Sequence, residues 1–134
     1  MLLGRLLRYA WASPATVVGL LFSIVAIVAG AQPRRVDGVL EVGGGRLRGL
    51  MAALPCFARF AAITFGHVII GLDHSLLARV RAHEFVHVRQ YERWGVLMLP
   101  VYLVASAILY LRGFDPYLDN PFEREAYAQA KRAD

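Results

Sequence analysis

The stretch HEFVH, residues 83–87, places two histidines four positions apart, with a glutamate directly after the first. Residues four apart share one face of an α-helix, so the ring nitrogens of His83 and His87 can reach one metal ion. Glu84 is rotated around the helix, and its carboxylate can reach a water molecule on that ion. The pattern predicts a zinc site with its own general base. The simpler alternative is two buried histidines that bond to backbone carbonyls.

The residues around this stretch predict a helix from about Leu76 to Trp94. Asp73 or Ser75 can cap its first turn, and Gly95 can end it. The residues at three- and four-residue steps form a mostly apolar stripe that includes both histidines: Leu76, Val80, His83, His87, Tyr91 and Trp94. We therefore expect the histidines on a core-facing side of the helix.

A catalytic zinc site needs three protein ligands and one open position, and the last helix offers the third ligand. Asn120 as cap and Pro121 as first helical residue open this helix, which should continue to about Arg132. Glu123 shares its face with residues typical of packing, whereas Glu125 shares its face with residues typical of solvent. Helix geometry thus favours Glu123 as the ligand, although a glutamate at the third helical position can instead serve the cap.

HEFVH followed downstream by NPFEREAYAQA resembles the gluzincin group of zinc metallopeptidases. In that group the third ligand is a glutamate on a later helix, with alanine three positions on, and Glu123 and Ala126 fit this frame. The resemblance covers these two short segments and the strand before the first. It implies zinc held by His83, His87 and Glu123, a metal-activated water, and Glu84 as the general base for peptide-bond hydrolysis. It also implies that the preceding strand binds a peptide or protein substrate in extended form.

Tyr127 stands where the group has Asp or Asn, so another group must orient the ligands. Asp115, Asp119 or a backbone carbonyl are the candidates. Tyr117 and Tyr127 could donate to a tetrahedral oxyanion, although tyrosines beside an apolar stripe more often pack.

An uncharged run between Arg8 and Arg34 exceeds the roughly 20 residues that cross a bilayer as a helix. The chain is 57% hydrophobic with a mean hydropathy of +0.47, which is high for a soluble protein. Residues 1–33 are therefore expected to be an N-terminal transmembrane anchor, with membrane lipid as a partner. One alternative is a secretory signal cleaved after Ala29-Gly30-Ala31, which would give a secreted protein. Another is a hydrophobic helix packed on the domain.

A second uncharged run, residues 95–111, lies between Arg93 and Arg112 and contains Pro100 near its centre. The two histidines precede this run and the glutamate follows it. A simple crossing would separate the ligands by the hydrocarbon thickness, about 30 Å. We therefore expect this run not to cross, but to be a buried core element or to lie in the membrane interface. Arg93 and Arg112 should then be on the same side.

Two segments between the first run and the helix predict strands. Asp37-Gly38 is a hairpin signal before VLEV, residues 39–42, and residues 63–70 read as one strand. Residues 47–60 could hold a short helix interrupted at Pro55. His67 is expected to be a paired strand histidine rather than a catalytic one. Cys56 is the only cysteine, which excludes an internal disulfide and a Cys-based zinc knuckle.

These features predict one α+β domain. Residues 34–134, including the hydrophobic segment 95–111, should form a minimal zincin-like unit of a short sheet, an HExxH helix and a ligand helix. About 100 residues do not suffice for a second lobe, so the cleft should be shallow, or roofed by the membrane or a partner. The net charge of +5 comes from scattered arginines, and nucleic acid is not expected as a partner. The alternative is a non-enzymatic membrane-bound zinc-binding or regulatory protein with a degenerate peptidase site.

Overall fold

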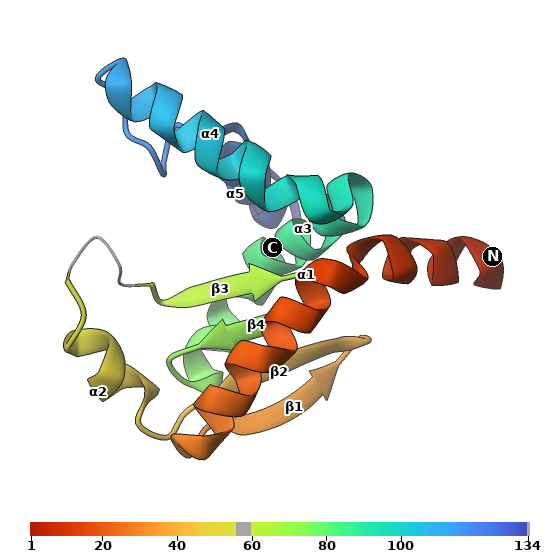
Figure 1. The fold of residues 1–134 in the computed structure, drawn as a ribbon, viewed down its shortest axis with the longest axis vertical. Helices are drawn as coiled ribbons and strands as arrows, with labels where there is room; N and C mark the ends of the chain where they lie inside the picture. Colours follow the sequence, from red (N-terminus) through yellow and green to blue (C-terminus); the bar gives the residue numbers. More distant parts are fainter. Residues whose placement is uncertain (56–59, 134) are drawn as a thin grey trace.

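The computed structural model describes residues 1–55 and 60–133, and it has three layers, with α1 on one face of a sheet and α3 on the other (Figure 1). The elements are α1 (Leu2–Val28), β1 (Gln32–Val36), β2 (Val39–Gly43), α2 (Leu47–Ala52), β3 (Ala62–Phe65), β4 (Val68–Gly71), α3 (His74–Trp94), the 3-10 helix η2 (Gly95–Leu97), α4 (Met98–Leu111) and α5 (Pro121–Ala133). The predicted α+β class is confirmed. Cys56 lies outside the described residues.

The sheet is mixed, with the strand order β1-β2-β4-β3. β1 and β2 form the predicted hairpin, and β2 contains the predicted strand 39–42. Asp37 and Gly38 both have positive φ, 48° and 84°, which a two-residue hairpin turn of this kind requires. β2 then pairs in parallel with β4, and β3 pairs antiparallel with β4 at the edge of the sheet.

The prediction of a single strand over residues 63–70 is wrong. This segment is a hairpin of β3 and β4, joined by Gly66 and His67. Gly66 has a φ of 60°, which a residue with a side chain rarely adopts. His67 therefore lies in the turn, where its Nε2 is 3.0 Å from Oε1 of Glu92. It is a paired histidine, as expected, but it is not in the strand.

The two faces of the sheet hold α1 and α3 in place. One face packs on α1 through Ala26, Ala31, Val42, Val68 and Ile70, and the other packs on α3 through Val39, Ile69, Leu77 and Val88. The buried carboxylate of Glu41 in β2 accepts two hydrogen bonds from Arg81 in α3, at 2.7 and 2.9 Å. These contacts fix α3 against the sheet, next to the edge strand β3.

α1 packs closely on the sheet through small residues. Its buried residues are Ala12, Gly19, Ser23 and Ala26. A Cβ atom on Gly19 would lie 2.7 Å from Cβ of Val68, so only glycine permits this approach. Pro14 lies inside the helix, and Figure 1 shows that α1 is bent in its N-terminal half. The helix is also long and apolar enough to cross a membrane.

α3 and α5 follow their sequence signals closely. Asp73 caps α3 by accepting a hydrogen bond from the Leu76 N–H at 2.8 Å, and the helix ends at Gly95. Asn120 caps α5 by accepting from the Phe122 N–H at 3.0 Å. The stripe on α3 is only partly buried, since its last member, Trp94, is 39% exposed.

α4 differs from its predicted form. Pro100 is the third residue of the helix, where no intrahelical N–H donor is required, so it does not interrupt the segment. Most of the large apolar side chains of α4 are exposed, among them Leu103, Val104 and Ile108. α4 is therefore not a buried core element.

Candidate metal centre

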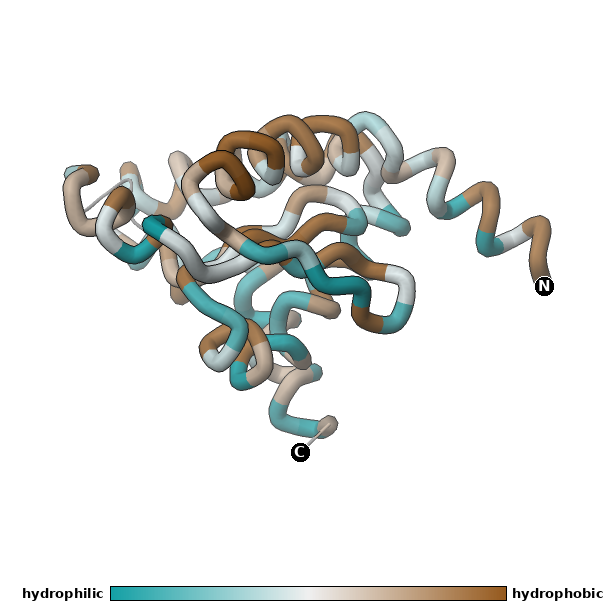
Figure 2. The backbone as a smooth tube through the Cα atoms, turned by 90° about the horizontal axis from the view of Figure 1, so that it is seen from below, coloured by the Kyte–Doolittle hydropathy of each residue, from teal (hydrophilic) through white to brown (hydrophobic). Residues whose placement is uncertain are grey.

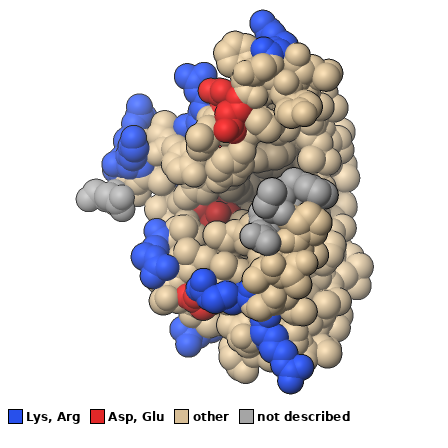
Figure 3. All heavy atoms as spheres, turned by 90° about the vertical axis from the view of Figure 1, so that its left-hand side faces the viewer, with Lys and Arg blue, Asp and Glu red and all other residues tan. Residues whose placement is uncertain are grey.

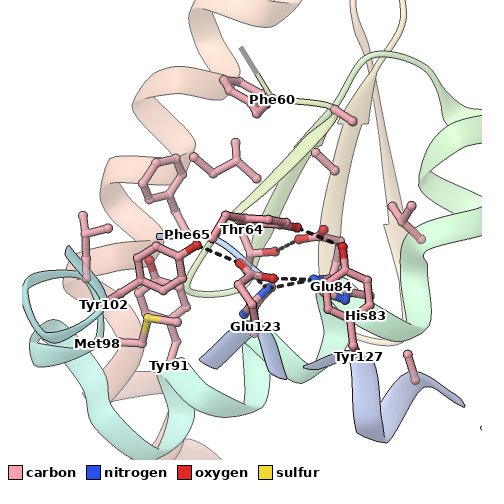
Figure 4. Close-up of a pocket in the computed structure, with 18 of the residues that line it drawn as sticks. Phe60, Thr64, Phe65, His83, Glu84, Tyr91, Met98, Tyr102, Glu123 and Tyr127 are labelled. Atoms are coloured by element: carbon pink, nitrogen blue, oxygen red, sulfur yellow. Dashed lines mark hydrogen bonds and ion pairs between the residues drawn. The ribbon is translucent and has the colours of Figure 1, made fainter. Parts of the chain in front are cut away.

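The three predicted metal ligands meet where α3 packs against α5. Nε2 of His83 lies 3.0 Å from Oε2 of Glu123, and Nε2 of His87 lies 3.4 Å from Oε1 of Glu123. The two histidine Nε2 atoms are 3.1 Å apart. Figure 4 shows Glu123 reaching His83 across the base of a cavity. Two imidazoles and one carboxylate thus converge on one point, and His87 and Glu123 are buried.

The ligand atoms of the triad are close enough together to hold one metal ion. A tetrahedral zinc with bonds of about 2.0–2.1 Å holds its ligand atoms roughly 3.3 Å apart. The two histidine Nε2 atoms are 3.1 Å apart, and the carboxylate approaches them through different oxygens, with Oε2 3.0 Å from His83 and Oε1 3.4 Å from His87. The donor set of two nitrogens and one oxygen suits zinc and other first-row divalent metals.

The acid–base state of the triad also favours a cation. Burial would raise the pKa of Glu123, but hydrogen bonds with His83 and His87 outweigh it and lower the pKa to about 2. Burial would lower the pKa of His87, but the neighbouring carboxylate of Glu123 raises it. The Glu123 carboxylate is therefore ionised over the physiological pH range and offers a negative charge to a bound cation.

Gln90 fixes the orientation of His87. The side-chain amide of Gln90 donates from Nε2 to the Phe122 carbonyl at 3.0 Å and to Oε2 of Glu125 at 2.8 Å. Its Oε1 therefore faces Nδ1 of His87, at 2.8 Å, and this oxygen can only accept. Nδ1 must carry the hydrogen, and the lone pair of Nε2 in neutral His87 points into the triad.

Tyr102 fixes the carboxylate. Its hydroxyl donates to Oε1 of Glu123 at 2.8 Å. The expectation that Asp115 or Asp119 orients a ligand is wrong, because both side chains bond to backbone N–H groups of their own loop. Gln90 could have been found from its position three residues after His87 on the same helix face. No sequence signal marks Tyr102, since its role depends on how α4 lies against α5.

Glu84 lies in the same cavity as the triad. It is only 6% exposed, and its Oε2 accepts a hydrogen bond from the Thr64 hydroxyl at 2.7 Å. Thr64 stands in β3, and Figure 4 shows this pair on the side of the cavity that faces the strand. Sequence reasoning missed Thr64, because the contact exists only once β3 lies alongside α3.

The cavity is a cleft of about 740 Å³. The edge strand β3 forms one wall, α4 and α5 contribute to the other, and the triad and Glu84 lie among its lining residues. Figure 3 shows the hollow, with acidic atoms inside it. A chain of this size thus forms a cleft with two walls, because α4 and α5 rise over the end of α3.

The remaining candidates lie at the rim of the cleft or outside it. Glu125 bonds to Gln90 and lies 3.2 Å from Arg93, not at the triad. The Tyr127 ring packs edge-on against His83 at 4.5 Å, and its hydroxyl is 3.3 Å from that of Tyr117. His67 and His74 are not among the residues that line the cleft.

Comparisons with protein-family profiles, with curated proteins and with solved structures found no match.

Proposed function

We propose that the protein is a membrane-associated zinc metallopeptidase of the gluzincin type. The observation that carries this proposal is the convergence of His83, His87 and Glu123 beside Glu84, in a cleft with an edge strand for a wall. A zinc ion on the triad would polarise the scissile carbonyl and acidify a water molecule.

Glu84 is the general base in this proposal. Its carboxylate takes a proton from the attacking water and passes it to the leaving amine. The Thr64 hydroxyl holds one carboxylate oxygen at 2.7 Å, which fixes the direction of the other. Burial of Glu84 keeps bulk water away from the transferred proton.

The substrate would bind as an extended strand beside β3. β4 lies between β2 and β3, so within the described residues the outer edge of β3 has no partner strand. Backbone hydrogen bonds from such an edge can align a peptide with little regard to its sequence. Thr64 lies within β3 and contacts Glu84, so a peptide on this edge passes directly by the base.

Tyr117 and Tyr127 are the candidates for stabilising the oxyanion. Both side chains line the cleft, and their hydroxyls lie together near His83. A hydroxyl donor at the developing negative charge lowers the barrier most when it is already in place.

Peptide hydrolysis by the purified full chain tests this function. The zinc-loaded protein in detergent should cleave members of a random peptide library, as read by mass spectrometry. Chelation should stop the cleavage and added zinc should restore it, because the triad has no other source of Lewis acidity. Metal-loaded protein that cleaves no peptide would support the non-enzymatic alternative instead.

A further inference from the structure

α1 turns its large apolar side chains away from the protein. The residues that face the sheet are small, whereas the outward residues are exposed and large: Val17, Val18, Leu21, Phe22, Ile24, Val25 and Val28. A helix of a water-soluble domain does the opposite and buries its large residues. Small residues at the packed face and large ones outside are typical of a helix surrounded by lipid.

α4 continues this apolar surface. Its outward residues include Leu99, Leu103, Val104 and Ile108, all exposed. Both helices lie at the front in Figure 1, and Figure 2 shows α1 as a largely apolar helix on the outside of the sheet. In Figure 3 the middle of the right-hand margin shows no acidic or basic side chains, whereas the left-hand side carries many. We call this surface the α1–α4 flank.

The packing of α1 conflicts with a simple crossing of the membrane. The Thr16 hydroxyl accepts a hydrogen bond from the His67 N–H at 3.1 Å, and the Tyr9 ring stacks on the His67 ring at 3.8 Å. α1 also covers the sheet along its packed face. If the helix crossed the bilayer with these contacts intact, the β1–β2 hairpin would enter the hydrocarbon. Arg34 and Arg35 would then lie in the hydrocarbon, where a charged side chain is strongly unfavourable.

We propose that the α1–α4 flank is an in-plane membrane-binding surface, by which the protein lies on one leaflet without crossing the bilayer. α4 alone has 14 residues, a length of about 21 Å, which is shorter than about 30 Å of hydrocarbon. The continuous helical run His74–Leu111 is long and apolar enough to cross, but its first part is α3, which packs on the sheet. Arg5 and Arg8 at the start of α1 and Arg112 after α4 lie at the ends of the flank. These arginines complement an anionic bilayer. The occupant of the flank is therefore lipid.

This attachment places one end of the cleft at the membrane. A second cavity of about 280 Å³ lies between α1 and α4 and is lined by apolar residues such as Val18 and Val96. It shares Phe65, Tyr91 and Leu99 with the main cleft, so the two cavities adjoin. If the proposed function holds, the substrate is a peptide segment next to a membrane anchor, which enters the cleft from the bilayer side.

Thiol labelling tests the in-plane attachment without requiring zinc or hydrolysis. Single cysteines at Gly4, Arg35 and Arg112 in a Cys56→Ser background are labelled with an impermeant reagent, in sealed right-side-out and inside-out membrane vesicles. Gly4 and Arg35 flank the packed part of α1, and Gly4 has open space around it. The proposal predicts that all three positions label in the same vesicle preparation. Labelling of Gly4 and Arg35 in opposite preparations means a crossing helix and overturns the proposal.

Fluorescence at the flank identifies its occupant. Leu21→Cys and Ile108→Cys carry an environment-sensitive dye, and Arg34→Cys on the β1–β2 hairpin is the matched control. With vesicles of phosphatidylcholine and phosphatidylglycerol, the Leu21 and Ile108 probes should shift to the blue and be quenched by spin-labelled lipid. The Arg34 probe should remain in water. Flank probes that escape lipid quenching, because a second copy or another protein covers the flank, overturn the proposal. A failure of peptide hydrolysis leaves both readouts unchanged.

Discussion

Replacing Glu84 by glutamine is expected to lower peptide hydrolysis by about 10²–10⁴-fold, the usual contribution of a general base. The amide has the shape of the carboxylate, and its oxygen can still accept the hydrogen bond from Thr64. It cannot take a proton from water, so the rate falls while the fold is kept. Zinc should stay bound, because Glu84 is not part of the triad. The measurements are kcat/KM and the zinc content of the same preparation.

Glu92→Gln is the matched control for this variant. Glu92 lies on the same helix and pairs with His67, outside the residues that line the cleft. The control should keep both zinc and activity. A Glu84→Gln variant that is zinc-loaded and as active as the wild type would show that the base lies elsewhere. If neither wild type nor variant hydrolyses peptides while both hold zinc, the protein is the non-enzymatic alternative.

Glu123→Ala is expected to weaken zinc binding by more than the roughly 10- to 100-fold that follows loss of a residue that only orients a ligand. Glu123 offers oxygens at 3.0 and 3.4 Å from the two histidines, so its removal takes away one of three ligands. Glu125→Ala is the comparison. Its carboxylate contacts Gln90 rather than the triad, and the loss should stay within the smaller range. Competition with a chromophoric chelator measures both.

His83→Ala and His87→Ala should lose zinc as Glu123→Ala does, since each removes one of the three groups that converge on the site. If Glu125→Ala proves to be the metal-poor variant and Glu123→Ala retains zinc, α5 must present a different face to α3, and the triad is not the metal site.

The main parts of the site could be predicted because local rules govern them. The spacing of His83 and His87 places them on one helix face, and Asn120 and Pro121 fix where α5 begins. The position where α5 begins determines that Glu123 lies on the face of α5 that packs against α3. The residues that orient the ligands could not be predicted in the same way. Tyr102 reaches the site only because the chain folds back between α4 and α5.

The merging of β3 and β4 into one predicted strand arises because this apolar segment shows no alternation of apolar and polar residues. All four residues of β4 are buried, so the segment gives no alternation that would separate it from β3. Gly66 is the only mark of the turn. The apolar run of residues 9–33 correctly predicts a helix long and apolar enough to cross a membrane, but it does not show that this helix also packs on the sheet. The small residues along one face of α1 are the sequence feature that indicates its packing on the sheet.

The metal content of the purified wild-type chain tests the central claim most directly. Elemental analysis after dialysis against zinc and then against metal-free buffer should find about one zinc per chain. A double variant, His83→Ala with His87→Ala, carried through the same steps should hold none while keeping the helix content of the wild type. Wild-type protein that is folded but holds no zinc would contradict the metal centre, and with it the proposed hydrolysis.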